Sequence, residues 1–134
     1  MKIPTRSIRT GIVALALATT AIPLALAAPA TASDGDVVRR GSCSGSTDWK
    51  LKAKHDDGRL EVEGEVDSNR NGQDWRWRMV HNGSVSARGL ATTKGPSGSF
   101  ERERRMVNLR GTDKIVFKAR NPRTGEVCRG VVRI

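Results

Sequence analysis

Charged residues at every second position of one short segment constrain the fold more than any other feature of this 134-residue chain. In WKLKAKHDDGRLEVEGEV, residues 49–66, three lysines occupy alternate positions, and three glutamates do the same after Asp57-Gly58. Asp-Gly favours a two-residue hairpin turn, and strict alternation is typical of a half-buried strand. A hairpin that turns there places lysines opposite glutamates, in the pairs Lys50–Glu65, Lys52–Glu63 and Lys54–Glu61.

The same register gathers the other side chains of this hairpin on its second face. There Trp49, Leu51, Ala53 and His55 oppose Val66, Gly64, Val62 and Leu60. A shift by one residue would bring the charges to the apolar face, so the charges help to specify the register. Exposed pairs contribute only about 0.2–1 kcal/mol each, and here the two signs balance. We therefore interpret the charged face as a solvated surface rather than a binding site.

The rest of the chain after residue 32 has the same rhythm of strands and turns, with no helical period. The segment 74–91 predicts a second hairpin around Asn82-Gly83, with Val80 opposite Val85 and Trp77 opposite Arg88. Its alternation places Trp75, Trp77 and Met79 toward a core and the intervening arginines toward water. FERERRMV, residues 100–107, is a charged run typical of an edge strand.

These segments, together with KIVFKAR and EVCRGVVRI, give about seven strands. We predict an all-β fold: a single immunoglobulin-like sandwich of two sheets, with a small β-barrel as the alternative. Trp75 and Trp77 follow Cys43 at too great a distance for the antibody signature. Cys43 and Cys128 are the only cysteines, and we expect them to form a disulfide. Closing so long a loop stabilises the fold by about 4 kcal/mol in the chain-entropy estimate.

The N-terminus has the features of a secretory signal. Basic residues precede the apolar stretch 11–28, and Ala30-Thr31-Ala32 fits a cleavage site. We predict a signal peptide over 1–32, with cleavage after Ala30 as the alternative, and then a flexible arm over 33–42 with a short edge strand at 37–38. The domain spans 43–134. The mature protein is expected to be secreted, extracellular and monomeric, without a transmembrane segment.

Basic residues are concentrated in the second half of the predicted mature chain. Residues 33–69 carry 6 basic and 9 acidic side chains, whereas residues 70–134 carry 15 and 5. Arginine predominates there and suits planar, bidentate anions. We therefore expect an anion-binding site for a polymer of the cell envelope or surroundings, formed by Arg76, Arg78, Arg88, Arg102, Arg104 and Arg105.

Other motifs carry weaker chemistry. DSNRNGQD resembles the start of a calcium loop, with Asp67, Asn69 and Asn71 as candidate ligands, but its twelfth position is Arg78 instead of glutamate. The two histidines have no linked nucleophile, and a lysine opposite each glutamate favours ordinary ionised acids. We thus expect no catalytic residues and no cofactor. The alternative function is a protein-interaction or inhibitor module that uses 100–106 or 94–98, and a hydrolase ranks third.

Three stretches carry a resemblance to a known group of proteins. The run EVDSNRNGQDWRWRMVHNG, followed by GPSGSFE and GEVCRG, resembles small secreted actinobacterial proteins of unknown function. The resemblance covers most of residues 43–134. It implies export and a single β domain, and it implies no activity.

Overall fold

The computed structural model describes residues 35–134, which form eight antiparallel strands in two sheets of four. The strands are β1 (Val37–Ser42), β2 (Asp48–Asp56), β3 (Arg59–Asp67), β4 (Asp74–His81), β5 (Ser84–Thr92), β6 (Ser99–Val107), β7 (Lys114–Arg120) and β8 (Val127–Arg133). Sheet A has the order β1-β2-β3-β6, and sheet B has the order β5-β4-β7-β8. The predicted two-sheet sandwich is confirmed, with eight strands instead of about seven.

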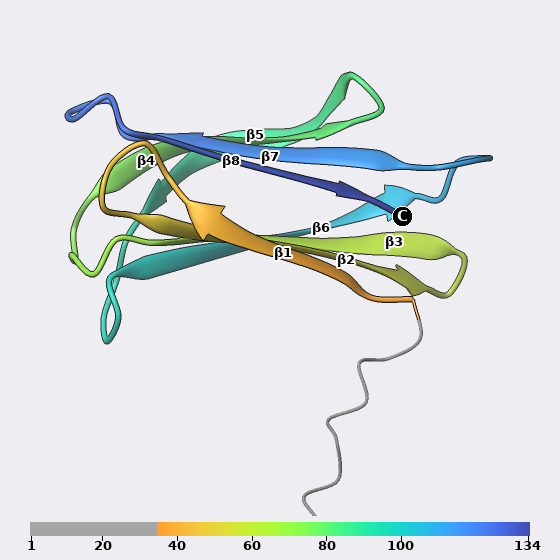
Figure 1. Cartoon of the computed structure of the whole chain (residues 1–134), viewed down its shortest axis with the longest axis horizontal. Helices are drawn as coiled ribbons and strands as arrows, with labels where there is room; N and C mark the ends of the chain where they lie inside the picture. Colours follow the sequence, from red (N-terminus) through yellow and green to blue (C-terminus); the bar gives the residue numbers. More distant parts are fainter. Residues whose placement is uncertain (1–34) are drawn as a thin grey trace, which may run out of the picture. The chain divides into compact units, whose positions relative to one another are not determined.

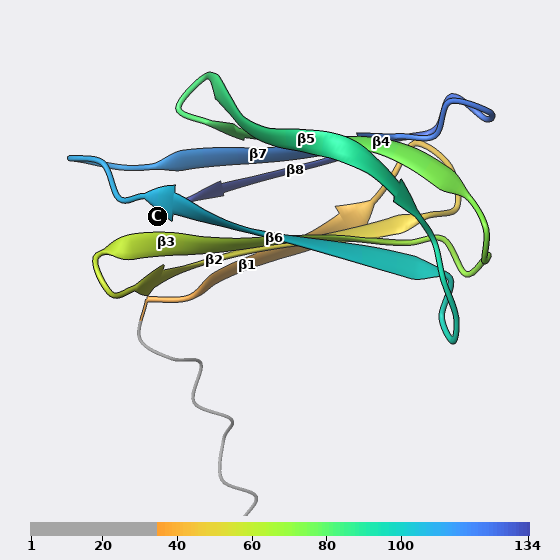
Figure 2. The ribbon, with the colours of Figure 1, turned by 180° about the vertical axis from the view of Figure 1, so that it is seen from behind.

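The two sheets lie face to face, and the chain crosses between them three times (Figures 1 and 2). β3 continues into β4 in the other sheet, and β6 continues into β7, while β3 pairs with β6 and β4 pairs with β7. Such Greek-key connections are found in immunoglobulin-like sandwiches. Each sheet keeps two free edges within the described residues, so the alternative of a small closed barrel is wrong.

The register of the first hairpin agrees with the sequence prediction at every position. Lys50 pairs with Glu65, Lys52 with Glu63 and Lys54 with Glu61. On the other face Leu51, Ala53, Leu60, Val62 and Val66 are fully buried. Asp57 and Gly58 both have positive φ (47° and 72°), as a tight hairpin turn requires.

The second hairpin contains a β-bulge that the sequence prediction lacks. Val80 pairs with Val85 as expected, but Met79 pairs with Ala87, so Ser86 is an extra residue in β5. Beyond the bulge Trp77 therefore faces Gly89, and the predicted pairing of Trp77 with Arg88 is wrong. Arg88 instead lies opposite Arg78, on the outer face of sheet B.

The segment before Cys43 is more ordered than a flexible arm. Residues 37–42 form β1, which pairs with β2 over its whole length, and Val37 packs against the core. The ordered domain thus begins before residue 43. The predicted signal peptide, residues 1–32, lies outside the described residues. Within residues 35–134 no helix is long and apolar enough to cross a membrane.

Two aromatic rings pack over glycines of the facing sheet and determine how closely the sheets approach. A Cβ added to Gly64 on β3 would lie 2.6 Å from the Phe117 ring of β7. A Cβ on Gly130 of β8 would lie 2.5 Å from the Trp49 ring of β2. The glycines are thus required as space for these rings, because interiors are packed without spare volume. Trp75 and Met79 are fully buried in the same core, and Trp77 is partly buried against it.

A disulfide joins the two ends of the domain, as the sequence predicts. Cys43, just after β1, is bonded to Cys128 in β8, across a sequence separation of 85. Cys128 is fully buried. The bond therefore links the end of β1 in sheet A to β8 in sheet B, and it restricts the unfolded chain over most of the domain length.

Replacing Gly64 with alanine tests the packing of the rings. We expect Gly64→Ala to lower the free energy of unfolding by about 1–3 kcal/mol, because the new methyl group overlaps the Phe117 ring. Chemical denaturation of the oxidised protein measures this difference. Glu65→Ala, at the neighbouring outward-facing position, is the control and should cost less than about 1 kcal/mol. Equal losses in the two variants would contradict the packing argument.

Candidate functional site

The outer face of sheet B gathers basic side chains from all four of its strands. Alternation places these side chains opposite the buried residues of each strand, and all are exposed except the half-buried Lys118. We define the basic face by six residues: Arg76, Arg78, Arg88, Lys118, Arg120 and Arg129. None of them takes part in an ion pair among the described residues, where the pairs involve Lys50, Lys52, Lys54, His81 and Arg105.

Strand register arranges these cations in rows across the sheet. One row contains four cations, one from each strand, in the order Arg88, Arg78, Lys118, Arg129. Neighbouring strands are about 4.8 Å apart, and like charges directly opposite each other destabilise a sheet. The next row toward the start of β4 has Arg76 and Arg120 at its centre, between Leu90 and Val127.

An apolar row borders the cations on the other side. It consists of four valines in register, Val85, Val80, Val116 and Val131. Val85 is 53% exposed, and the three others are half-buried. Valine suits a pleated surface, so this row needs no functional explanation. Beyond it the outer face continues with two more exposed cations in register, Lys114 and Arg133.

The basic face contains an open hollow of about 800 Å³. Its lining includes five of the six cations, together with Trp77, Val85, Gly89 and Leu90, and it includes no carboxylate. Trp77 reaches it because Gly89 has no side chain: a Cβ there would lie 3.3 Å from the indole Nε1. The nearest acid in register is Asp74, which accepts a hydrogen bond from Thr92 Oγ1 at 2.6 Å. This hollow is chemically suited to an anion.

The outer face of sheet A has the opposite character, because its charges neutralise one another. Lys50 Nζ lies 2.8 Å from Glu63 and 2.7 Å from Glu65, and Lys54 Nζ lies 2.9 Å from Glu61. Hydrogen bonds from Lys50 hold the pKa of Glu63 below its ordinary value and raise that of Lys50. Two hollows on this sheet are lined by cations and carboxylates together. The structure thus supports interpreting this face as a solvated surface.

Three glutamates of sheet A come close enough to form an acidic cluster. Carboxylate oxygens of Glu63, Glu65 and Glu101 all lie within 4.8 Å of one another. Burial raises the pKa of Glu101 above its ordinary value, and the charge of Glu63 acts in the same direction. Because Lys50 already binds two of the three carboxylates, we assign the cluster to the ion-pair network.

The structure divides the six arginines predicted as an anion site. Arg76, Arg78 and Arg88 share the basic face, whereas the other three belong to β6 in sheet A. Arg105 lies on the outer face of that sheet and donates to Asp56 at 2.7 Å. Arg102 and Arg104 alternate with it and lie on the inward-facing side of β6, at the sheet edge. The structure thus brings three of the six predicted arginines together on one face, and anion binding by the set stays a prediction.

Three cations of the basic face were missed from the sequence: Lys118, Arg120 and Arg129. A signal for them existed. In KIVFKAR and EVCRGVVRI the apolar residues alternate with these cations, as they do around Arg76 and Arg78. The missing information was strand order, because only the pairing of β4 with β7 and of β7 with β8 makes them neighbours.

The segment that resembles a calcium loop forms the turn between β3 and β4. Asp67 Oδ1 accepts a hydrogen bond from the Asn69 amide at 3.1 Å, and Asn69 has a φ of 56°. Such a local bond is typical of aspartate in turns. Asp67 and Asn69 thus have a turn-forming role, and calcium binding by them and Asn71 stays a prediction.

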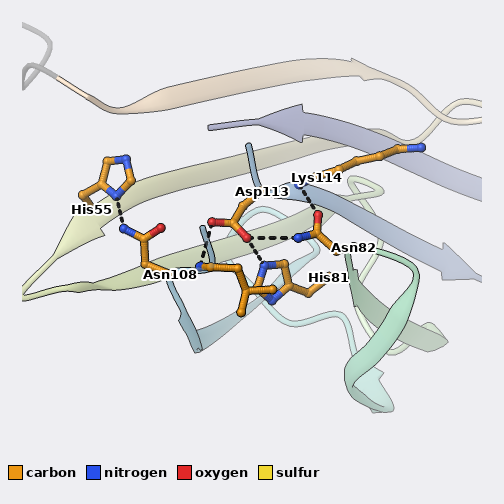
Figure 3. A network of polar contacts seen from close by, with 7 residues as sticks. His55, His81, Asn82, Asn108, Asp113 and Lys114 are labelled. Atoms are coloured by element: carbon orange, nitrogen blue, oxygen red, sulfur yellow. Dashed lines mark hydrogen bonds and ion pairs between the residues drawn. The ribbon is translucent and has the colours of Figure 1, made fainter. Parts of the chain in front are cut away.

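A second polar cluster centres on the buried carboxylate of Asp113, at the end of the sandwich where β7 begins (Figure 3). Its Oδ1 accepts hydrogen bonds from His81 Nε2 at 2.5 Å and from Asn82 Nδ2 at 3.2 Å. Its Oδ2 accepts one from the Leu109 amide at 3.2 Å. Sequence reasoning missed this cluster because its members are 4 to 32 residues apart along the chain.

The network continues from Asp113 to the second histidine. With its amide nitrogen toward Asp113 Oδ2 (3.1 Å), Asn108 accepts a hydrogen bond from His55 Nδ1 at 3.2 Å. Figure 3 shows the contact of Asn108 with His55 and that of Asp113 with His81. No serine or threonine hydroxyl forms a hydrogen bond to either histidine among the described residues. The hydrogen bonds of the cluster tie together β4, β7 and the turns beside them.

Removing the Asp113 carboxylate tests this structural role. We expect Asp113→Ala to lower the free energy of unfolding by about 3 kcal/mol, because His81, Asn82 and Leu109 lose their buried acceptor. Denaturant titration measures the loss. Glu103→Ala, which removes an exposed acid outside the ion pairs, is the control and should change stability by less than about 0.5 kcal/mol. A cost below about 1 kcal/mol for Asp113→Ala would contradict the role.

Comparison with protein families, with curated proteins and with solved structures found no significant match. The resemblance to small secreted actinobacterial proteins therefore stays a prediction. What the chain does must be inferred from its own surface.

Proposed function

We propose that this protein is a secreted, non-catalytic domain that binds a polyanion of the cell envelope or its surroundings through the basic face. The observation that carries the proposal is the row Arg88, Arg78, Lys118, Arg129, in which four cations lie side by side without a neutralising carboxylate. An isolated sheet loses stability through such a row. A bound polyanion would reverse this effect, because each cation would gain a counter-charge. Binding would also release the counterions that are condensed on the polyanion.

The residue types support an anion with forked or planar oxygens. Five of the six cations are arginines, whose guanidinium groups form paired hydrogen bonds with phosphate, sulfate or carboxylate. The side chains in the cation and valine rows of this outer face are aliphatic or basic, and Trp77 is the one aromatic residue that lines the hollow beside them. The ligand would accordingly be recognised by its repeated charges.

The second candidate function, an interaction with an extracellular protein, is supported by one observation. β6 is a free edge of sheet A, and an extended peptide can add to such an edge. Its charged side chains, however, are of the kind that discourages strand addition. We therefore rank this function below polyanion binding, which is supported by six cations outside the ion pairs of residues 35–134.

Charge reversal in the centre of the row tests the proposed function. We expect the purified domain to bind immobilised long-chain polyphosphate with an affinity that falls steeply with salt, with a log–log slope of about −4 if all six cations contribute. Arg78→Glu should weaken binding by about tenfold or more at low salt and flatten this slope. Trp77 lines the same hollow, so its fluorescence gives a second measure of occupancy.

The matched control is Arg59→Glu, which makes the same change of net charge at an exposed position in sheet A. It should weaken binding by less than about threefold, because it lies away from the basic face. Equal losses in the two variants would mean that only net charge matters. If the unaltered domain does not bind at low salt, the proposed function is wrong. Co-sedimentation of the domain and its variants with the immobilised polyphosphate gives an independent measure of binding.

A further inference from the structure

The edge of sheet B next to the basic face opens into a second, smaller hollow. This hollow, of about 330 Å³, lies between β5 and β6 and is lined by Leu90, Ala91, Thr92, Lys94, Ser99, Phe100 and Arg102. Leu90 also lines the hollow of the basic face and is 69% exposed. The two hollows thus meet at Leu90, on the free edge strand β5.

The second hollow has two cations and no lining carboxylate. The guanidinium of Arg102 lies 5.9 Å from the centre of the Phe100 ring and donates to the backbone oxygen of Glu101 at 2.8 Å. Lys94 is exposed, and neither cation belongs to an ion pair of the described residues. The acids of β6, Glu101 and Glu103, lie on the opposite side of that strand, facing the outer surface of sheet A.

We propose that the anion-binding surface turns around the β5 edge, so that a linear polyanion runs from the cation row past Leu90 to Lys94 and Arg102. This inference rests on the proposed function and specifies its ligand as a chain long enough to occupy both hollows. A short anion fills only the basic face. A flat charged surface likewise meets the outer face of sheet B but cannot follow the turn onto the inward-facing side of β6.

Two probes of different length test the inference on the full mature domain. The variant is Lys94→Gln/Arg102→Gln, and the probes are tripolyphosphate and long-chain polyphosphate. We expect the double variant to lose about tenfold in affinity for the long chain, with a salt slope shallower by about 1 to 2. Its affinity for tripolyphosphate should stay within about twofold. The control Arg59→Gln/Arg110→Gln removes two exposed cations elsewhere and should leave both affinities within about twofold.

The outcomes separate this inference from the proposed function. If Lys94→Gln/Arg102→Gln binds the long chain as tightly as the unaltered domain, or loses both probes equally, the turn around β5 is wrong. The proposed function then still stands if Arg78→Glu weakens long-chain binding. If Arg78→Glu has no effect either, both fail. Arg102 packs on the ring of Phe100, so replacing it could disturb the core. Lys94→Gln alone leaves this packing intact, and it should still weaken binding of the long chain more than binding of tripolyphosphate.

Discussion

The structure depends on the close approach of two sheets, which is possible only where a large ring faces a residue without a side chain. Phe117 lies over Gly64 and Trp49 lies over Gly130, so each sheet supplies one ring and one glycine. The Cys43–Cys128 bond connects the sheets in the same region. Because this packing occupies the inner faces, the charged side chains on alternate positions are directed outward. Strand register then determines which charged side chains lie next to each other on the two outer faces.

The two outer faces use charge for different purposes. On sheet A, the lysines of β2 lie opposite the glutamates of β3, and the ion pairs Lys50–Glu65 and Lys54–Glu61 support the register that brings them together. On sheet B, register places cations opposite one another, and their repulsion weakens the pairing of β4 with β5 and β7. Packing against sheet A and the buried Asp113 network at one end of the sandwich offset this cost. A surface that is stable in spite of its charges, rather than because of them, is available to a ligand.

The first hairpin could be predicted residue by residue, whereas the site could not. Lys50, Lys52 and Lys54 lie within 15 residues of their partners, and the Asp57-Gly58 turn determines which residues meet. The basic face depends on contacts between β4, β7 and β8, and alternation within one strand contains no information about which strand lies beside it. Arg102 and Arg104 show a related limit: alternation with the buried Phe100 and Met106 turns them inward, and only the position of β6 at the edge of its sheet keeps them accessible.

The bulge in β5 has a consequence for how this surface is specified. Because Ser86 is an extra residue, Val85 and Arg88 both point outward although they are three positions apart; in a regular pairing of the same residues, Arg88 would lie opposite Trp77 on the inner side. In that regular pairing, Ala91, which is buried, and Leu90, which is exposed, would change places together with the arginine. Part of the surface is therefore encoded by the bulge and not by the kind of residue in the strand: deleting Ser86 would restore regular pairing and leave Arg88 opposite Arg78, whereas closing the bulge with all residues kept would turn Arg88 inward.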